Sequence, residues 1–449
     1  MKRPKRMSNR IRKIAKKEPS IFWLNEDCLR HIIKFLTVRD RIRLSGVCKR
    51  LQSLVMLTWS DIKSLRISFN VRRDRDKMKY TLPLLKLVLG HCGPFLKDLT
   101  LGSWREKGYT SPVMSYITKS CPNLISLNLK GVKLHVKSAE ILAQTYSKLT
   151  HLTLGWCQQA CTHAISKLFQ ANKELKLIEF IECYHLESSC FSKLHAESIE
   201  SITFGRKCNF EVSEVINDIE KFINLKTIYV ERNGLFIDGI NELLGELPKK
   251  TNLENLIVDA SCNYSEEFVP LSNIIYYTNL RKVTLTYRIA YDELLVAIAK
   301  HCKNLTYIKL ANSPAVTDLG LSTLISSLNI EELCIDNLCE ISSSFFAYVH
   351  MPSLKIFQSF NNPHWNNESF RNLMSAADNL IQIQIKNNQV NYNALINDAT
   401  QYSLNRGNET FLKLLLEVED QVPPTGRIAP YLLVELIRTR HSASDEDSD

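Results

Sequence analysis

The segment Leu149-Thr-His-Leu-Thr-Leu154 contains the pattern that decides the fold. Its last two leucines alternate with a single residue, which is the spacing of a short, half-buried strand. The same pattern, with Ile in some places, recurs along most of the 449-residue chain, with a period of about 26 residues. It begins at Leu96, Leu124, Leu149, Leu175, Ile199, Leu225, Leu253, Leu280, Leu305, Ile330, Leu354 and Leu380. A further match at 62–67 is a candidate first unit.

Between these strands the apolar residues change to helical spacing. Two examples are the sets Ala139, Leu142, Ala143 and Tyr146, and Leu321, Leu324, Ile325 and Leu328. One strand–turn–helix unit cannot bury both of its apolar faces, so neighbouring units must stack and align their strands as a parallel sheet inside an arc. We therefore predict an α/β fold, a leucine-rich-repeat horseshoe over residues 61–420 with terminal caps. The expected cap is a helix over 392–404 followed by an apolar run over 411–418, with a last helical turn over 431–438.

The cysteines follow the same repeat. Five of them lie eight or nine residues after the first aliphatic residue of their unit, namely Cys157, Cys183, Cys208, Cys262 and Cys339. Others precede the strand, as in Cys121-Pro-Asn-Leu124, and Thr317-Asp-Leu-Gly-Leu321 supplies a helix entry that Thr317 or Asp318 can cap. The units resemble the cysteine-containing class of leucine-rich repeats.

Two groups of these residues have some features of zinc ligands. They are Cys157, Cys161 and His163, and the pair Cys334 and Cys339. A closed zinc site needs four convergent ligands, and no second pair completes either group. We therefore expect small buried side chains at turns, with no metal and no cofactor.

A second helical pattern precedes the repeats, within residues 20–60. Leu29, Ile32, Ile33 and Leu36 fall at i, i+3, i+4 and i+7, and after a turn at 37–40 another apolar pattern runs to Trp59. So short a segment makes two or three small helices and cannot bury all of its apolar surface alone. That surface either covers the open first repeat or binds a partner.

The segment from Leu24 to Leu36, with Val47-Cys-Lys-Arg-Leu51 and Trp59, resembles an F-box in which Asn25 stands for the usual proline. The resemblance implies docking on a Skp-family adaptor and, through it, on a cullin and a RING subunit. The adaptor contacts that it implies are Leu24, Leu29, Ile32, Ile33, Leu36, Val47, Cys48, Leu51 and Trp59. An F-box followed by cysteine-containing repeats is a known family architecture.

The implied function is that of the substrate-recognition subunit of an SCF-type cullin-RING E3 ubiquitin ligase, with an unknown target protein held by the arc. The chain itself is then not an enzyme. No Gly-rich phosphate loop, Gly-x-Ser-x-Gly or His-Glu-x-x-His motif is present. The alternative is a repeat scaffold or inhibitor that acts without ubiquitination, with residues 22–60 serving only as a cap.

Strand alternation places the residues between the buried aliphatics on the concave surface of the arc. Several of these are more apolar than solubility requires, and aromatic side chains are frequent at binding hot spots. With one residue at the rim, the predicted target-binding set is Trp156, Leu177, Ile181, Tyr229, Ile257 and Tyr307. The alternative is that they only cover neighbouring strands. The concave positions mix both charges, so nucleic acid is not the favoured ligand.

The two ends of the chain carry opposite charges. The chain has a net charge of +10, and residues 1–17 contain nine Lys or Arg and no acid, so 1–19 is predicted as a flexible basic arm, while 421–449 ends in an acidic tail. The proposed nuclear-import residues are Lys2, Arg3, Lys5, Arg6, Arg10, Arg12 and Lys13. An inert arm, nonspecific binding of nucleic acid and a weak transit peptide are the alternatives.

Composition favours a folded intracellular protein. Hydrophobic residues make up 45% of the chain, yet no uncharged apolar window is long enough to cross a bilayer, and no secretory h-region follows the basic arm. We expect no membrane association, reduced cysteines, and a location in the nucleus, the cytoplasm or both.

Overall fold

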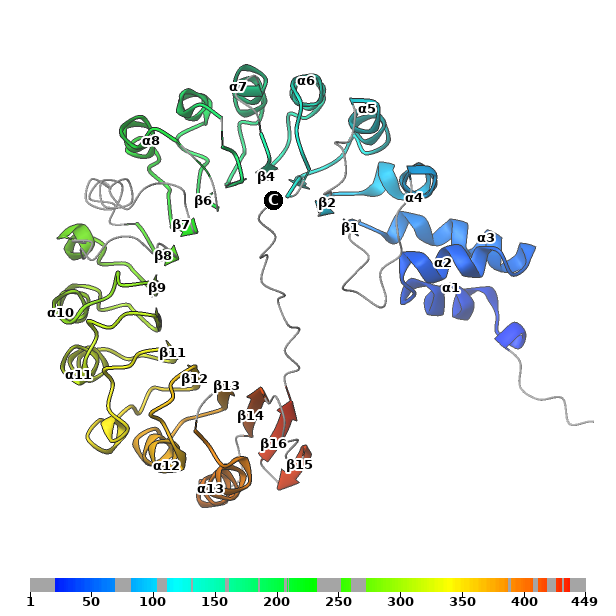
Figure 1. Ribbon diagram of the computed structural model, residues 1–449. Coiled ribbons are helices and arrows are strands. Elements are labelled where there is room, and N and C mark those ends of the chain that lie inside the picture. Colours follow the sequence, from blue (N-terminus) through cyan, green and yellow to red (C-terminus); the bar gives the residue numbers. More distant parts are fainter. Residues whose placement is uncertain are drawn as a thin grey trace, which may run out of the picture.

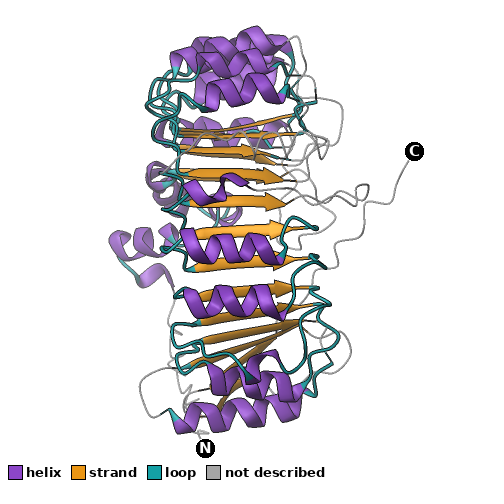
Figure 2. Cartoon of the chain, turned by 90° about the vertical axis from the view of Figure 1, so that its left-hand side faces the viewer, coloured by secondary structure: helices purple, strands orange, loops and turns teal. Residues whose placement is uncertain are grey.

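The computed structural model shows an arc of stacked repeats with a small helical unit at its N-terminal end (Figure 1). Its helices lie on the outside of the arc and its strands line the inside (Figure 2). The structure describes residues 21–68, 82–102, 111–130, 132–157, 161–184, 186–205, 208, 210–231, 252–259, 272–386, 389–406, 411–417, 425–429 and 432–436.

The described strands form one 16-stranded sheet, in which β1 to β14 follow each other in sequence order and pair in parallel. This confirms the predicted parallel solenoid and the candidate first unit. The strands are β1 (Ser64–Ser68), β2 (Asp98–Gly102), β3 (Ser126–Asn128), β4 (His151–Gly155), β5 (Leu177–Ile181), β6 (Ser201–Phe204), β7 (Thr227–Glu231), β8 (Asn255–Asp259), β9 (Lys282–Thr286), β10 (Tyr307–Ala311), β11 (Glu332–Asp336), β12 (Ile356–Phe360), β13 (Gln382–Lys386) and β14 (Leu412–Glu417).

The outer layer of the arc consists of 3-10 helices in some repeats, among them η6 (Ser272–Tyr276) in the repeat that begins at Leu253, and of α-helices in most repeats. These helices are α4 (Leu82–Cys92), α5 (Ser111–Ser120), α6 (Val136–Thr145), α7 (Thr162–Ala171), α8 (Val212–Ile219), α10 (Asp292–His301), α11 (Asp318–Ser327), α12 (Asn367–Ala376) and α13 (Tyr392–Asn405). The two shortest repeats, which begin at Leu175 and Ile330, carry only the 3-10 helices η5 (Ser188–Lys193) and η7 (Phe345–Ala347). The helical segment predicted for these two units is therefore a 3-10 helix.

Helix starts are tied to the preceding repeat by polar side chains. Thr317 caps α11 as predicted, since its Oγ1 accepts a hydrogen bond from the backbone N–H of Leu319 at 3.2 Å. The same Thr317 donates from its N–H and its hydroxyl to the two carboxylate oxygens of Asp292, at 2.8 and 2.6 Å. Gly320 packs so tightly on Asp292 that a Cβ there would lie 2.8 Å from the Asp292 Cα atom. The Thr-Asp-Leu-Gly-Leu signature is therefore an inter-repeat contact.

The C-terminal end of the sheet differs from the expected cap. Helix α13 confirms the predicted helix, but the apolar run at 411–418 forms β14, a further parallel strand. The segment predicted as a last helical turn is wrong: Leu432–Leu436 is strand β16, which pairs in parallel with β14 and in antiparallel with β15 (Gly426–Ala429). Strand β16 lies between β14 and β15, so the sheet extends past residue 420 and ends in the antiparallel strand β15.

One continuous apolar core runs through all repeats and contains the strand aliphatics together with the helix stripes. Aromatic side chains fill its widest parts, for example Phe180, Phe191, Phe204 and Phe210, whose ring centroids lie 5.0 to 6.4 Å apart. Cys157, Cys183 and Cys208 are buried after their strands, as predicted, whereas Cys339 is exposed. Cys262 lies outside the described residues.

The N-terminal unit consists of η1 (Ile21–Trp23), α1 (Glu26–Lys34), α2 (Val38–Ser45), α3 (Lys49–Thr58) and η2 (Trp59–Asp61). A buried arginine, Arg41, holds these helices together. Its guanidinium donates to the backbone carbonyls of Lys34, Leu36 and Thr58 at 2.9, 3.2 and 2.6 Å. These carbonyls lie at or just beyond the C-terminal ends of α1 and α3, where no further helical N–H reaches them. Burial lowers the pKa of Arg41.

The helical unit is joined to the arc without a break in the core. The buried Trp59 ring stacks on His91 of α4, with centroids 5.5 Å apart and planes at 24°. Leu29, Ile33 and Val55 belong to the same buried cluster as Leu65 of β1. The unit therefore caps the first repeat with one side, as one alternative predicted, while its other side faces away from the arc (Figure 1).

Candidate functional site: two binding surfaces

Exposed apolar side chains concentrate on the helical unit. Among the described residues, 21 large apolar side chains are exposed, and eight of these lie within residues 21–57: Ile21, Trp23, Leu24, Ile32, Phe35, Val47, Met56 and Leu57. Phe35 is 78% exposed and Val47 and Trp23 are each 61% exposed. The other thirteen are distributed over the whole arc. Such a concentration on a small unit is typical of interaction surfaces.

The nine sequence-predicted adaptor residues divide between this surface and the core. Leu24, Ile32 and Val47 are exposed, and Leu36 and Cys48 are half-buried. Leu29, Ile33, Leu51 and Trp59 are buried, with exposed fractions of 4% or less. In the described structure these four side chains support the helices and the junction with α4, so they are not available for direct contact. The prediction needs correction at those positions, because helical spacing identified the inward stripe.

At the start of α1, Asn25 occupies the position where proline is usual. Asn25 caps the helix, with its Oδ1 accepting from the backbone N–H of Cys28 at 2.8 Å. Arg50 of α3 donates to the carbonyl of Leu24 at 2.8 Å and so brings the start of α1 next to the start of α3, where Val47 and Cys48 lie. Leu24, Val47 and Cys48 therefore lie near the starts of α1 and α3, which this hydrogen bond connects.

Sequence reasoning missed five of the exposed residues, namely Ile21, Trp23, Phe35, Met56 and Leu57. The signal that could have found them is an apolar residue off the helical stripe, such as Phe35, which lies one residue before the last stripe position Leu36. In the structure Phe35 ends α1 and contacts His31 edge-on, with ring centroids 5.2 Å apart.

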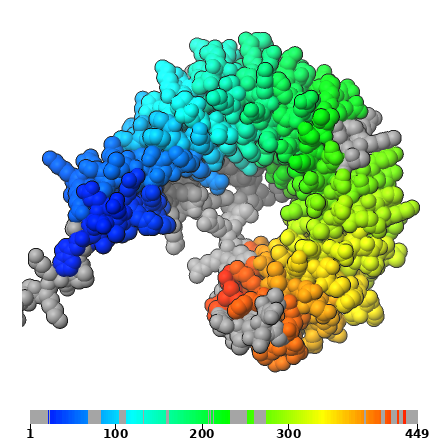
Figure 3. Space-filling view, turned by 180° about the vertical axis from the view of Figure 1, so that it is seen from behind, coloured from blue at the N-terminus to red at the C-terminus, as the bar shows by residue number. Residues whose placement is uncertain are grey.

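The concave face of the arc is the second surface, and Figure 3 shows how the repeats curve around it. Register pairs its middle positions across the strands, with Glu179 beside Thr203, then Tyr229 and Ile257. Of the predicted target-binding residues, Leu177, Tyr229, Ile257 and Tyr307 are half-buried on this face, and Trp156 is exposed at its rim.

Ile181 is not part of the open surface, and that prediction is wrong. It is only 5% exposed, because the chain after β6 packs against it at Gly205, whose added Cβ would lie 2.9 Å from the Ile181 Cγ1 atom. Trp156 adopts a left-handed backbone with φ of 51°, and its N–H donates to the carbonyl of Ile181 at 3.1 Å. This turn directs the chain out of the sheet and leaves the indole at the rim.

Charge is unevenly distributed over the concave face. Burial, with Glu231, Asp259 and Glu179 adding to it, raises the pKa of Tyr229 to about 12. Three carboxylates therefore act on one tyrosine between β5 and β8. Further along, the Lys282 ammonium lies over the Tyr307 ring at 5.7 Å from its centroid.

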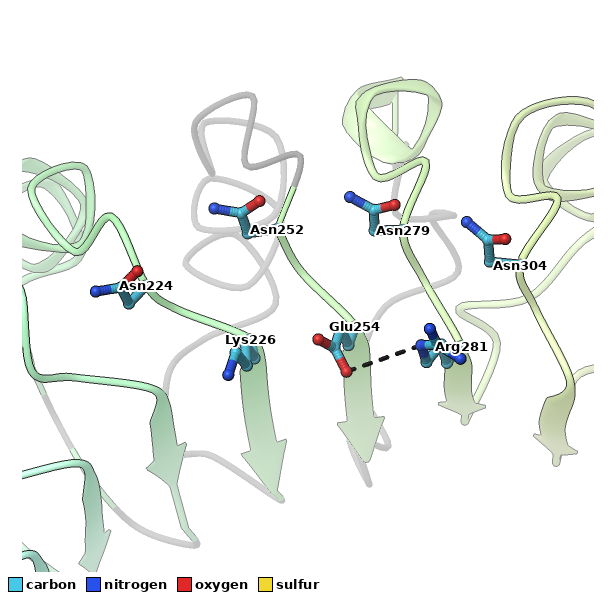
Figure 4. A pocket seen from close by; sticks show the side chains of 7 residues that line it. All are labelled: Asn224, Lys226, Asn252, Glu254, Asn279, Arg281 and Asn304. Atoms are coloured by element: carbon cyan, nitrogen blue, oxygen red, sulfur yellow. Dashed lines mark ion pairs between the residues drawn. The ribbon is translucent and has the colours of Figure 1, made fainter.

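The edge of the sheet where the strands begin carries polar side chains that form hydrogen bonds with the neighbouring repeats. A shallow hollow of about 220 Å³ lies there, lined by Asn224, Lys226, Asn252, Glu254, Asn279, Arg281 and Asn304 (Figure 4). Several of these asparagines donate to carbonyls of the preceding repeat, as Asn224 does to Glu197 at 2.7 Å and Asn304 to Thr278 at 3.2 Å. These amides serve the stacking of the repeats.

Within the described ranges, no three His, Cys, Asp or Glu side chains lie together as a metal would require. Burial raises the pKa of the Cys92, Cys121, Cys302 and Cys334 thiols to about 12, which leaves them protonated and unreactive near neutral pH. No helix in the described part of the chain has the length and apolar character to span a membrane. The predicted nuclear-import residues and the acidic tail lie outside the described residues.

Among known protein families, the F-box domain family matches residues 21–62. The Caenorhabditis elegans protein EEED8.10, described as a candidate RNA-binding protein, is 21% identical over 352 residues, which cover 76% of this chain and 47% of that protein. This chain thus spans about half the length of that relative.

Among solved structures, a chain of the yeast Rad7–Elc1 complex aligns with a TM-score of 0.47 and 14% identity, covering 82% of this chain and 90% of the other. LegL7 from Legionella pneumophila, a leucine-rich-repeat-containing protein, aligns with a TM-score of 0.41 and 16% identity, covering 60% and 90%. With the matched F-box and the repeats described above, the chain is an F-box and leucine-rich-repeat protein.

Proposed function

We propose that this chain is the substrate-recognition subunit of an SCF-type cullin-RING E3 ubiquitin ligase. In this role the F-box docks on a Skp-family adaptor, which connects it to a cullin and a RING subunit, and the arc binds the target protein. One observation carries the proposal: the F-box match covers the same residues, 21–62, that leave the largest concentration of apolar side chains exposed. The chain performs no chemistry of its own in this role.

The junction between the two parts supports the same role. Because Trp59, Leu29 and Val55 share one core with the first repeat, the F-box and the arc form a single packed body at their junction. An adaptor bound to the F-box therefore fixes where the arc, and any target on it, lies relative to the ligase. Holding two reactants in one place raises their effective concentration, which is the contribution expected of a recognition subunit.

Co-expression with a Skp-family adaptor tests this function. The wild-type chain is expected to co-purify with the adaptor, and a double variant Ile32→Asp, Val47→Asp is expected to lose it, because two charges on the exposed face oppose burial. The matched control is Leu319→Asp on α11, which places a charge at a 70% exposed leucine of the arc and should leave the complex intact. A folded wild-type chain without adaptor binding contradicts the proposal and favours the scaffold or inhibitor.

A second candidate function is RNA binding by the basic residues 1–17. The description of the C. elegans relative and the nine Lys or Arg of this segment favour it. Such binding should weaken steeply with salt and disappear when 1–17 are deleted, because phosphate contacts release counterions. Filter binding of a labelled single-stranded RNA at several salt concentrations measures both effects, and salt-independent binding rejects this candidate.

We also propose that residues 2–13 direct nuclear import. Clustered Lys and Arg side chains suit an acidic receptor groove. A fluorescent fusion of the full chain is expected in the nucleus, and changing the seven Lys and Arg of 2–13 to Gln is expected to leave it in the cytoplasm. An unchanged distribution contradicts the import role and leaves an inert arm.

A further inference from the structure

The carboxylates along the edge where the strands begin are already paired with bases. Glu200 contacts two lysines, Lys176 at 2.8 Å and Lys226 at 3.3 Å. The next pairs are Glu254 with Arg281 at 3.9 Å and Glu331 with Lys355 at 2.9 Å. These acids are neutralised within the chain and offer little to a charged partner.

The carboxylates on the concave face have different partners. Glu179 in β5 accepts a hydrogen bond from the Thr153 hydroxyl, and Asp259 in β8 accepts one from the Thr286 hydroxyl, each at 2.8 Å. Neither forms an ion pair with a side chain in the described part of the chain. One hydroxyl holds each carboxylate in position, while a carboxylate can accept about four hydrogen bonds. Both therefore keep free acceptor capacity on the face of the sheet.

An apolar pair of side chains lies next to these two carboxylates, in the same row as Glu179 and on or beside the strand of Asp259. Tyr229 of β7 and Ile257 of β8 are direct neighbours in register, and both are half-buried with the remainder of each side chain open to the concave side. The pair offers an aromatic face and an aliphatic neighbour, which suit the apolar stem of a long side chain.

The charge on this part of the face has one sign. The concave positions of β5 to β8 include Glu179, Glu231 and Asp259 and no Lys or Arg. A lysine or arginine of a partner can lay its methylene groups on Tyr229 or Ile257 and place its charged group at Glu179 or Asp259. An acidic or phosphate-bearing partner is repelled by the same positions.

We propose that the concave face of β5 to β8 binds target proteins through an extended basic segment with two Lys or Arg residues about four positions apart. Glu179 and Asp259 are three strand spacings apart across the sheet and two residues apart along the strands, about 16 Å in all, which corresponds to between four and five residues of extended chain. The inference rests on the proposed role of the arc as the target-binding part, and it supplies the chemical class of the target. Its test needs no adaptor, so its failure is distinct from a failure of the F-box proposal.

The test is selection from a random 12-residue peptide display library on the immobilised full-length chain. Enriched peptides are expected to contain pairs of Lys or Arg about four positions apart. Fluorescence anisotropy with one such labelled peptide is expected to show at least tenfold weaker binding to the double variant Glu179→Gln, Asp259→Asn, and weaker binding to Tyr229→Ala. The matched control Glu254→Gln, Glu331→Gln removes paired edge carboxylates and is expected to bind as the wild type does.

Three outcomes overturn the proposal. Enriched peptides without basic pairs contradict the assigned chemistry, and equal binding by wild type and the Glu179→Gln, Asp259→Asn variant contradicts the assigned place. The third concerns the chain's own nine basic residues at 1–17. If changing them to Gln tightens peptide binding tenfold, the arm itself occupies the face, and the face is not a target site.

Discussion

The F-box and the solenoid both contain amphipathic helices, but the solenoid buries the apolar side chains of its helices more completely than the F-box does. Within the solenoid each inner repeat has a neighbour on both sides, so strand aliphatics such as Leu256 and helix residues such as Leu295 are fully buried. The F-box has three helices of 8 to 10 residues and only one neighbour, the first repeat. Its outward side keeps Phe35 and Val47 exposed. The difference shows that exposed apolar surface arises where stacking stops.

Alkaline pH should give the largest difference between the two regions, because it should lower the stability of the solenoid, which contains buried thiols with raised pKa values. The thiols of Cys92, Cys121, Cys302 and Cys334 have pKa values raised to about 12 by burial, against a usual value of 9.0. Their contribution to stability is fully present below pH 9 and is lost as the pH rises toward 12, at about 1.4 kcal/mol per thiol and pH unit. Urea unfolding at pH 8 and pH 10.5 measures the loss. A Cys302→Ala variant should lose less over the same interval, and an equal loss contradicts the account.

Charges inside the F-box should unfold it while the arc persists. The double variant Leu29→Asp, Ile33→Asp buries two carboxylates in the shared core and is expected to cost about 4 kcal/mol or more. Limited proteolysis should then cut within residues 21–62, while circular dichroism retains most of the helix and strand signal of the repeats. Loss of the whole signal would show that the arc depends on its N-terminal cap.

Arg41→Met tests how much one buried cation contributes to the F-box. The variant removes three hydrogen bonds to the carbonyls of Lys34, Leu36 and Thr58 and leaves those acceptors unpaired. The expected cost is about 3 kcal/mol. Thermal unfolding followed by Trp fluorescence should show an earlier transition. The matched control is Arg43→Met, whose guanidinium forms a solvent-exposed ion pair with Asp40 at 3.7 Å and should change stability little.

Gly320→Ala tests how closely neighbouring repeats of the arc pack, because it adds a methyl group at the contact between them. A Cβ at this position would overlap Asp292 of the preceding repeat, so α11 must move away from α10. The expected cost is about 2 kcal/mol, as for other overpacked sites. The urea midpoint of the repeats should fall, and the adaptor binding proposed for the F-box should stay unchanged. Gly46→Ala is the control, because its added Cβ approaches only the Arg43 carbonyl, at 3.4 Å.

Asn25→Ala should have the smallest effect. It removes the side-chain cap on the N–H of Cys28, which is typically worth about 1 kcal/mol. The F-box should melt slightly earlier, and Asn25→Asp should restore the wild-type value because Asp caps equally well. No change in Asn25→Ala would indicate that the cap contributes nothing to the start of α1.

Much of the fold was predictable because burial repeats with the sequence period. The aliphatics of Leu149–Leu154 and their equivalents predicted the strands. The strand at 432–436 was not predictable, since a five-residue apolar segment becomes a strand only through pairing with β14. The burial of Ile181 depends on Gly205 in the next repeat, which a single-repeat pattern does not reveal. For the F-box, helical spacing identifies the inward residues Leu29 and Ile33, while the exposed Phe35 lies off that pattern.

The most direct test of the account is hydrogen–deuterium exchange of the full chain with and without a Skp-family adaptor. The account predicts that the adaptor slows exchange within residues 21–57 and leaves the concave strands β5 to β8 unchanged, because the proposed function assigns the adaptor to the exposed apolar face and the target to the arc. Protection confined to the arc, or none at saturating adaptor, would contradict the assignment of the two surfaces.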